Sequence, residues 1–548
     1  MIDRLPSIGK DFRLWLFILA GIVLIGLSIL LAWVSSDFED IQSWGLYLLT
    51  NLFAGGIMLG GWLVVKADKS FDLPNWLGWL MIGAAGLRLL AGVIWYAGLP
   101  SWGYGTEVEQ AGYIMADAHA RDTAAWELAQ SDKPLLTAFG EYRQVDQYGG
   151  MMYLSGLVYR YLGGVQHFPI QMSVLTASFS ALAILFTWAF ARRLWGEKVA
   201  LLAAWILALF PDAIILGSSQ MREAFLMTLV AAALYGLVRY IQDKTWSGLA
   251  WLVSSLLLML PFSPPIAGIF LVMIIIIAFS VDGWQVFRQP RFLVILAGIA
   301  LVAGLGIWFA WERIAPEGIN NPVALVNWWF RESARWQAYF VKRSSPLIRR
   351  IFNTTPDWIH TPILLGYGVL QPFLPGALLD QGAPIWKGIA IWRSLGWTIL
   401  LPFLLVAPIL LWGWKEKRRL AMGLLIAVWM GILVAALRSG GDLWDNPRYR
   451  VVFICMQVVL VAWVWSSQRD SKNPWLWRMV IGLVIILAWF VPWYLQRSGQ
   501  IIWPINNVFV TLGFGLASVV IVFLWMCLRG RNRGENVRSQ MDSPADKD

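Results

Sequence analysis

The chain has 548 residues, of which 58% are hydrophobic and 14% are charged. Soluble proteins carry roughly 25% charged residues, so this composition excludes a soluble globular fold. The formal net charge is +10, but the basic residues are scattered through short segments between apolar runs. That distribution indicates membrane orientation and argues against nucleic-acid binding.

Apolar runs that cross a membrane as helices need about 20 residues. The first run is longer than the apolar core of a secretory signal and precedes no evident cleavage site, so it predicts an uncleaved first span. Proline at 211 and near 261–265 predicts kinks or half-spans. The expected fold is an all-α polytopic membrane protein with about fourteen transmembrane helices, at residues 14–34, 44–65, 76–98, 168–190, 199–216, 221–241, 247–261, 265–281, 292–310, 389–412, 419–437, 451–466, 478–495 and 505–527.

Lysine and arginine fall on every second loop, as the positive-inside rule requires of cytoplasmic loops. They lie before the first span, near residues 66–69, 192–198, 239–244, 288–291 and 415–419, and again after residue 528. We therefore expect a multi-pass protein of the cytoplasmic membrane with both termini in the cytoplasm. Two long segments, 99–167 and 311–388, then face the extracytoplasmic side.

This pattern divides the chain into six parts. The parts are three helices in 1–98, a first extracytoplasmic loop in 99–167, helices four to nine in 168–310, a second extracytoplasmic loop in 311–388, helices ten to fourteen in 389–528, and a disordered cytoplasmic tail in 529–548.

The second long loop interleaves basic and aromatic residues over 327–350, which predicts an interfacial helix that binds anionic membrane lipids.

The first long loop opens with a Gly-rich stretch that carries Glu107 and Glu109, and Tyr113 follows one turn later. A carboxylate just outside a span is well placed to accept a proton from an attacking hydroxyl group. Solvated loop acids are the alternative. Asp146 precedes 154–162, a short stretch that predicts an interfacial helix. It is a second candidate acid, or a helix-start residue that accepts backbone N–H bonds.

Two further segments place arginine on the same side. Arg222 and Glu223 stand at a helix start after the fifth span, where an arginine beside a helix N-terminus suits a phosphate. A local ion pair or snorkelling is the alternative. Arg448, Tyr449 and Arg450 stand at the mouth of an outward-facing span, against the positive-inside trend. They predict a contact with lipid phosphate or with a phosphorylated ligand.

Taken in order and on one face, these motifs resemble the GT-C superfamily of polytopic glycosyltransferases, especially the branch of protein O-mannosyltransferases and lipid A aminoarabinose transferases. The similarity covers roughly residues 75–245 and 440–470. It rests on residues 109–116, with Glu109 where the family usually has Asp, on Gly149-Gly150 in place of two prolines before 154–164, on Arg192-Arg193, on Leu209-Phe210-Pro211, on Arg222-Glu223 and on 447–450.

The resemblance implies a membrane enzyme that transfers a sugar from a polyprenyl-phosphate donor to a glycan, lipid or protein acceptor outside the cytoplasm. Direct attack would invert the anomeric carbon. It implies Glu109 as the base and Arg222, Arg448 and Arg450 around the donor phosphate. Whether Glu109 or Glu107 is the base stays open, and the further candidate site residues are Asp146 as a second acid, Tyr449 at the phosphate, Glu223 and Tyr113.

Two other functions stay open. A polysaccharide polymerase or O-antigen-ligase-like enzyme also has many spans and an arginine-rich outer loop, but the early acidic motif favours sugar transfer. A transporter or flippase predicts matching halves and midplane charges, whereas the charges here cluster at one face.

Metal binding has little support in the sequence. The three histidines, at 119, 167 and 360, are far apart, and Cys455 and Cys527 lie inside apolar runs, so neither a zinc-ligand pattern nor a disulfide framework is predicted. No cofactor is therefore assigned. A divalent ion bound at Glu109 and Asp146 stays open, and the oligomeric state is not indicated.

Overall fold

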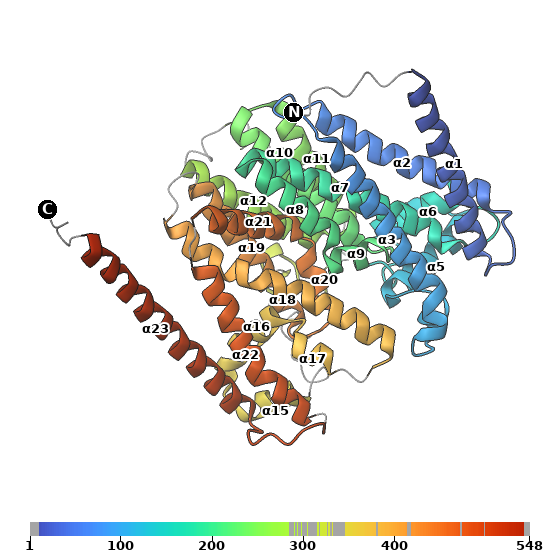
Figure 1. Ribbon diagram of the computed structural model, residues 1–548. Helices are drawn as coiled ribbons and strands as arrows, with labels where there is room; N and C mark the ends of the chain where they lie inside the picture. The colour runs from blue at the N-terminus through green and yellow to red at the C-terminus, as the bar shows by residue number, and fades with distance from the viewer. Residues whose placement is uncertain are drawn as a thin grey trace. The chain divides into compact units, whose positions relative to one another are not determined.

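The computed structural model describes residues 10–283 and 346–541, apart from 380–381, 414–417, 472–473 and 498, together with isolated positions between 284 and 345. Within these residues every regular element is a helix (Figure 1). Ten of the described helices are long and apolar enough to cross a membrane, and two bent pairs raise this number to 12. The protein is a multi-pass helical membrane protein, as its composition predicts.

Ten predicted spans coincide with single long helices. They are α1 (Lys10–Ser35), α2 (Trp44–Lys66), α3 (Asn75–Trp102), α7 (Pro169–Trp195), α10 (Arg222–Asp243), α12 (Pro264–Asp282), α18 (Pro384–Gly413), α19 (Arg418–Ser439), α22 (Trp475–Arg497) and α23 (Val508–Met541). α23 runs past residue 529, where the sequence predicts a disordered tail.

The remaining four predicted spans differ from this pattern. The spans at 199–216 and 451–466 are bent pairs, α8 (Glu197–Leu209) with α9 (Pro211–Gly217) at 57° and α20 (Asp445–Val451) with α21 (Ile454–Ser471) at 75°. The span at 247–261 is α11 (Trp246–Met259), which has only 14 residues. The span at 292–310 and most of the basic-aromatic segment 327–350 lie outside the described residues, so the count of fourteen stays a prediction.

The chain forms two compact units, the first comprising residues 1–371 and 415–462 and the second 372–414 and 463–548. In the first unit, α7 is packed by α2, α3, α8 and α10, and 94% of its apolar window is buried. Small residues such as Ala177, Ser180 and Ala181 are fully buried along it and let neighbouring helices approach closely. This bundle carries the loops that form the candidate site.

α10 and α11 touch through two glycines. A Cβ atom on Gly236 would lie 2.7 Å from the carbonyl oxygen of Gly248, and one on Gly248 would lie 2.7 Å from the backbone nitrogen of Tyr240. These distances are too short for any side chain. The backbones of the two helices are therefore in direct contact, which fixes one side of α10.

The break between α8 and α9 is stabilised by a buried arginine. Phe210 has an extended backbone and Pro211 begins α9, so the last carbonyls of α8 have no partner within their own helix. Arg88 of α3, which is fully buried, donates from Nη2 to the carbonyl of Leu207 at 3.5 Å and from Nη1 to that of Ala84 at 3.0 Å. One carbonyl group at this bend in a membrane helix thus obtains a hydrogen bond from the neighbouring helix α3.

Four short helices make up the first long loop: α4 (Glu107–Gln110), α5 (Ala116–Gln130), the 3-10 helix η1 (Leu135–Phe139) and α6 (Gly150–Leu162). Gly149 precedes α6 with φ +76°, and a Cβ there would lie 2.5 Å from the Ala138 carbonyl oxygen. The N–H of Gly150 donates to the Pro261 carbonyl at 3.1 Å. The glycine pair therefore lets α6 lie directly on η1 and on the turn before α12. The predicted helix 154–162 is part of α6.

At its C-terminal end, α10 joins a charged cluster around Asp68, which follows α2. Arg193 at the end of α7 contacts Asp68 at 2.6 Å and Asp243 at 2.9 Å, and the Tyr235 hydroxyl donates to Asp68 at 2.6 Å. Three loops that are rich in basic residues therefore meet at one end of the first unit, as the alternate-loop pattern predicts. That this end faces the cytoplasm stays a prediction.

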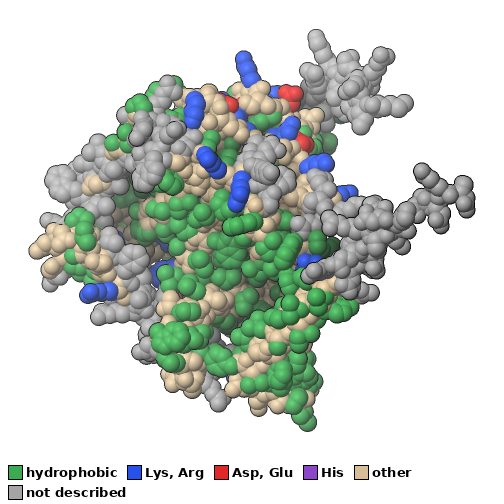
Figure 2. Space-filling view, turned by 90° about the vertical axis from the view of Figure 1, so that its left-hand side faces the viewer, with side chains coloured by type: hydrophobic (Ala, Val, Ile, Leu, Met, Phe, Trp, Pro, Cys, Tyr) green, Lys and Arg blue, Asp and Glu red, His purple; other side chains and the backbone are tan. Residues whose placement is uncertain are grey.

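The second unit contains α17 (Leu374–Leu378), α18, α22 and α23, and α22 packs against the other three. Outward-facing apolar side chains are common in both units, for example Leu19 and Leu59 in the first and Ile521 in the second. Figure 2 shows a face on which hydrophobic side chains cover a broad area, with Lys and Arg mostly in its upper half. So large an apolar surface fits a lipid environment.

Candidate active site

Charged side chains converge on Arg448 of α20 at the N-terminal end of α10. Because α10 has 22 residues, its two ends lie about 33 Å apart. The Nε atom of Arg448 donates to Glu223 Oε1 at 2.8 Å, and its Nη1 lies 2.9 Å from Asp117 Oδ2 and 3.5 Å from Asp445 Oδ1. The residues come from α10, α5 and α20 of the first unit. Three carboxylates thus surround one buried guanidinium.

Asp117 is the outward-facing carboxylate of this cluster. Its side chain is 55% exposed, whereas that of Arg448 is 8% exposed. Asp117 lies in the first turn of α5, where the positive end of the helix dipole favours an anion. Arg121, one turn later, donates from Nε to the Asp117 carbonyl at 2.7 Å, and its Nη2 lies 4.0 Å from the carboxylate. This geometry places an accessible carboxylate beside the guanidinium groups of Arg448 and Arg121.

Arg121 and Arg222 add two more guanidinium groups. Burial lowers the pKa of Arg121, while the negative charges of Glu223 and Asp146 oppose this shift. The Nη1 atom of Arg121 is buried without a hydrogen-bond partner. Arg222 Nε lies 3.6 Å from Glu223 Oε1, and its guanidinium carbon lies 5.1 Å from the ring centre of Tyr148. Arg121 and Arg222 therefore have N–H groups available to donate hydrogen bonds to a further anion.

Glu223 is the buried centre of these contacts. Its side chain is 0% exposed, and its Oε2 has no hydrogen-bond partner. A buried carboxylate is stable only when cations surround it, and Arg448 and Arg222 supply them. Glu223 therefore holds the arginines in place.

Glu109, the carboxylate that the sequence favours as the base, has a different set of contacts. Its Oε2 accepts from the backbone N–H groups of Tyr104 and Thr106 at 2.8 and 3.0 Å and from the Thr106 hydroxyl at 3.0 Å. Thr106 and Glu109 form a capping box at the start of α4, and Glu109 is 3% exposed. Glu107 is exposed in the same turn. The catalytic role of both residues stays a prediction.

Asp146 supports the start of α6. Its Oδ2 accepts from the Met152 N–H at 3.0 Å and its Oδ1 from the Tyr148 N–H at 3.4 Å, which is the helix-start role that the sequence allows. It also lies close enough to Arg121 for its charge to act on that group. Asp146 therefore positions Tyr148, which borders the cluster.

The predicted phosphate-binding segment 448–450 is divided by its helix. Arg448 points into the cluster. The ring centre of Tyr449 lies 5.7 Å from the guanidinium carbon of Arg448 and 6.0 Å from that of Arg438. Arg450 instead donates to the carbonyl of Gln371 at 2.8 Å, directly after α16 (Asp357–Leu370). The structure brings Arg222, Glu223, Arg448 and Tyr449 together and gives Arg450 a contact elsewhere in the unit.

Tyr113 belongs to a separate buried network. Its hydroxyl donates to Asp122 at 2.6 Å, Tyr159 donates to the same carboxylate at 2.6 Å, and His167 lies 2.9 Å from it. His167 in turn stacks on Trp126. This network ties the segment before α5 to α6 and so fixes the position from which Asp117 projects.

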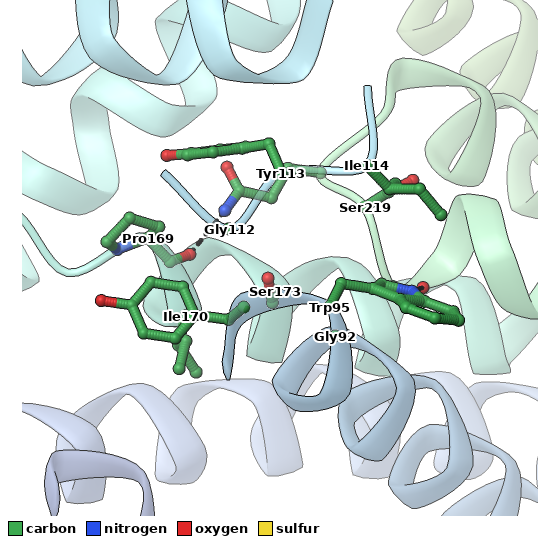
Figure 3. Close-up of a pocket in the computed structure, with 12 residues that line it drawn as sticks. Gly92, Trp95, Gly112, Tyr113, Ile114, Pro169, Ile170, Ser173 and Ser219 are labelled. Atoms are coloured by element: carbon green, nitrogen blue, oxygen red, sulfur yellow. Dashed lines mark hydrogen bonds between the residues drawn. The ribbon is translucent and has the colours of Figure 1, made fainter. Parts of the chain in front are cut away.

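A small pocket lies beside the turn that leads into Arg222 and Glu223. Figure 3 shows Tyr113 and Ser173 on opposite sides of it, with Trp95 to one side. Trp95 donates from its indole nitrogen to the Ser218 hydroxyl at 2.9 Å, and Gln220 donates to the Pro169 carbonyl at 2.6 Å. The turn 218–220 is thereby anchored to α3 and α7, which orients the start of α10.

Among the described residues, no three His, Cys, Asp or Glu side chains are grouped so that they could hold a metal ion. The two acids considered for a divalent ion, Glu109 and Asp146, both accept hydrogen bonds from backbone N–H groups. Around Arg448 the guanidinium already lies between the carboxylates. The cationic groups of the site are arginines.

The sequence pointed to four residues of the cluster but not to Asp117, Arg121, Tyr148 or Asp445. Asp117 and Arg121 share one face of α5, four residues apart, and this spacing was the available signal. The Thr-x-x-Glu pattern at 106–109 is a capping-box signature and could have marked Glu109 as a helix-start residue.

Comparison with known proteins supports the resemblance found in the sequence. Residues 153–308 match the family model described as dolichyl-phosphate-mannose-protein mannosyltransferase. This stretch contains Arg222 and Glu223, while Asp117 and Arg448 lie outside it. The resemblance to polytopic glycosyltransferases is thus confirmed over these residues.

Other comparisons are weaker. A search among curated proteins gives no significant match. Among solved structures, the chain is similar to the archaeal oligosaccharyltransferase AglB from Archaeoglobus fulgidus, in complex with an inhibitory peptide and a dolichol-phosphate, with 15% sequence identity and a TM-score of 0.40. The similarity covers 80% of this chain and 54% of AglB, so the chain spans about half the length of that protein.

Proposed function

We propose that the protein is a glycosyltransferase that uses a polyprenyl-phosphate-linked sugar as donor and acts on the extracytoplasmic side of the membrane. The observation that carries this proposal is the cluster of Arg448, Glu223 and Asp117. It combines buried guanidinium groups with one accessible carboxylate at the end of a membrane helix. The family match over 153–308, named for a dolichyl-phosphate sugar donor, supports the same class of donor.

In the proposed reaction, an acceptor hydroxyl attacks the anomeric carbon of the donor sugar. The bond between that carbon and the phosphate oxygen breaks, and its electron pair leaves with the phosphate. Arg448, Arg222 and Arg121 stabilise the negative charge that develops on this oxygen, because preorganised cations in a poorly solvated site act strongly on developing charge. Direct attack inverts the anomeric carbon.

The proton of the acceptor passes to a carboxylate. We propose Asp117 for this role, because its side chain is exposed and lies beside the arginines, whereas Glu109 is buried in a capping box. General-base catalysis contributes about 10²- to 10⁴-fold, so Asp117→Asn should lower turnover by that order while the thermal unfolding midpoint changes little. Glu109→Gln should chiefly lower the unfolding midpoint.

The test uses membranes that contain the full chain and labelled polyprenyl-phosphate sugars, with release of polyprenyl phosphate as the readout. Glu127→Gln is the matched control, since Glu127 is an exposed carboxylate on the same helix as Asp117. Full activity of Asp117→Asn together with loss in a stably folded Glu109→Gln protein would return the base assignment to Glu109. No release from any polyprenyl-phosphate sugar would contradict the proposed activity itself.

A further inference from the structure

The two close partners of Arg448 differ in their surroundings. Glu223 binds Nε at 2.8 Å with a side chain that is 0% exposed, whereas Asp117 binds Nη1 at 2.9 Å with a side chain that is 55% exposed. Withdrawing the buried carboxylate would leave an uncompensated charge in the protein. Asp117 can instead exchange its contact for water at little cost. It is the exchangeable partner, and Glu223 is the permanent one.

A donor phosphate and the Asp117 carboxylate need the same hydrogen-bond donor. Both are oxyanions that bind guanidinium groups with similar geometry, and Nη1 of Arg448 is already bound by Asp117. The buried Nη1 of Arg121, which has no hydrogen-bond partner, and the guanidinium of Arg222 lie in the same cluster. An anion that enters would therefore meet donors on Arg121 and Arg222 and, on Arg448, an Nη1 that Asp117 already occupies.

We infer that the donor phosphate displaces Asp117 from Arg448, and that this exchange makes Asp117 available as the base. While Asp117 is paired with Arg448, its Oδ2 lies 2.9 Å from the guanidinium Nη1 and is directed at that group, away from an acceptor hydroxyl. Once the phosphate has taken over Nη1, the carboxylate is released next to the leaving group. The acceptor is then deprotonated only when a donor is bound. This inference rests on the proposed function and adds a binding order to it, with the donor first.

The inference predicts how a change at Asp117 alters the affinity for the phosphate lipid. If Asp117 competes with the phosphate, removing its charge should strengthen phosphate binding even though transfer is lost. Exposed or half-exposed ion pairs contribute up to about 1 kcal/mol, so the expected gain in affinity for Asp117→Asn is up to about fivefold. Asp445 lies farther from the same Nη1, at 3.5 Å, and Asp445→Asn should therefore give a smaller gain.

The experiment measures the dissociation constant of a fluorescent polyprenyl phosphate on the purified full chain in detergent, with the corresponding polyprenol as the uncharged control. Asp117→Asn and Asp117→Ala should both bind the phosphate lipid more tightly than wild type. Glu127→Gln on the same helix should bind as wild type does. Two substitutions at 117 guard against an effect of one particular side chain, and unfolding midpoints establish that each protein is folded.

The outcomes separate the two proposals. Equal or weaker binding by both Asp117 variants, with wild type still preferring the phosphate lipid over the polyprenol, overturns the displacement and leaves the proposed function standing. A wild-type protein with no preference for the phosphate lipid overturns both. Tighter binding by the Asp117 variants together with loss of transfer supports the exchange.

Discussion

Glu223 and Arg448 lie 225 positions apart in the sequence, yet the guanidinium Nε of Arg448 donates to the Glu223 carboxylate at 2.8 Å inside the first unit. The contact joins the N-terminal end of α10 to the short helix α20. Because α20 itself packs on α9, α10 and α19, this pair holds together the segments that form the candidate site.

Replacing either Glu223 or Arg448 by an uncharged residue should destabilise the protein. Glu223→Gln removes the closest buried carboxylate of Arg448, and Arg448→Met removes the closest cation of Glu223. Asp117 and Arg222 remain nearby, so each change should cost at most about 3–5 kcal/mol. The double variant removes both charges and should lose clearly less than the sum of the single changes. Thermal unfolding in detergent measures all three proteins. Strictly additive losses would show that the two side chains act independently.

Gly149 should tolerate no side chain, and Gly105 provides a matched comparison. Both have positive φ, +76° and +74°, but a Cβ on Gly149 would lie 2.5 Å from the Ala138 carbonyl, whereas one on Gly105 meets nothing within 4 Å. Gly105→Ala should cost only the backbone strain, about 1–2 kcal/mol. Gly149→Ala should cost more and should displace α6, and unfolding midpoints compare the two. Equal losses would mean that the close contact at Gly149 does not exist.

The contact between α10 and α11 is tested in the same way. Gly236→Ala places a methyl group 2.7 Å from the Gly248 carbonyl, while the Cβ of Gly268→Ala in α12 meets nothing within 4 Å. Alanine is about 1 kcal/mol more favourable than glycine inside a helix, so Gly268→Ala should be neutral or stabilising. Gly236→Ala should lower the unfolding midpoint. A midpoint for Gly236→Ala at or above that of wild type would contradict the direct backbone contact.

The Asp68 cluster should lose its contribution in acid. Burial raises the pKa of Asp68, but hydrogen bonds from Tyr235, Arg193 and Ser70 outweigh it and lower the pKa from 3.8 to about 2. A carboxyl group whose pKa is lower in the folded protein stabilises it above the unfolded pKa. That stabilisation is therefore complete above pH 4 and disappears as the pH falls toward 2.

Unfolding midpoints across this pH range should show the effect. Wild type should exceed Asp68→Asn at neutral pH, and the difference should shrink below pH 4 as Asp68 becomes protonated. Asp72→Asn in the same loop is the control, since Asp72 is exposed, and it should match wild type throughout. A difference between wild type and Asp68→Asn that stays constant down to pH 2 would show that charge is not its cause.

The membrane helices could be predicted from sequence because the signal is local. An apolar run of span length is sufficient for α2 or α12, whatever surrounds it. Bends are harder to predict, since Pro211 marks the break after α8 but the contact from Arg88 that stabilises it comes from another helix. The length of α11 is also hard to predict, because Pro261 interrupts its apolar run. Its 14 helical residues are fewer than a straight span needs.

The candidate site could be predicted only in part. Arg222, Glu223 and Arg448 stand out because charges at the ends of apolar runs are unusual wherever they occur. Asp117 does not stand out, because its significance comes from the distance to Arg448, which no local pattern encodes. Glu109 stands out for its place beside a span, and the structure shows it in a capping box with Thr106, the N-cap residue of α4. Its role as the base stays a prediction.

The central position of α7 bears on how the protein is made. Its apolar window is 94% buried beneath α2, α3, α8 and α10, two of which precede it in the chain and two of which follow. Because the chain is made from its N-terminal end, α7 is synthesised before α10, so the side of α7 that α10 covers is at first without this partner. A nascent chain arrested before α10 should therefore be a substrate for membrane quality control, and release from that surveillance should coincide with the arrival of α10.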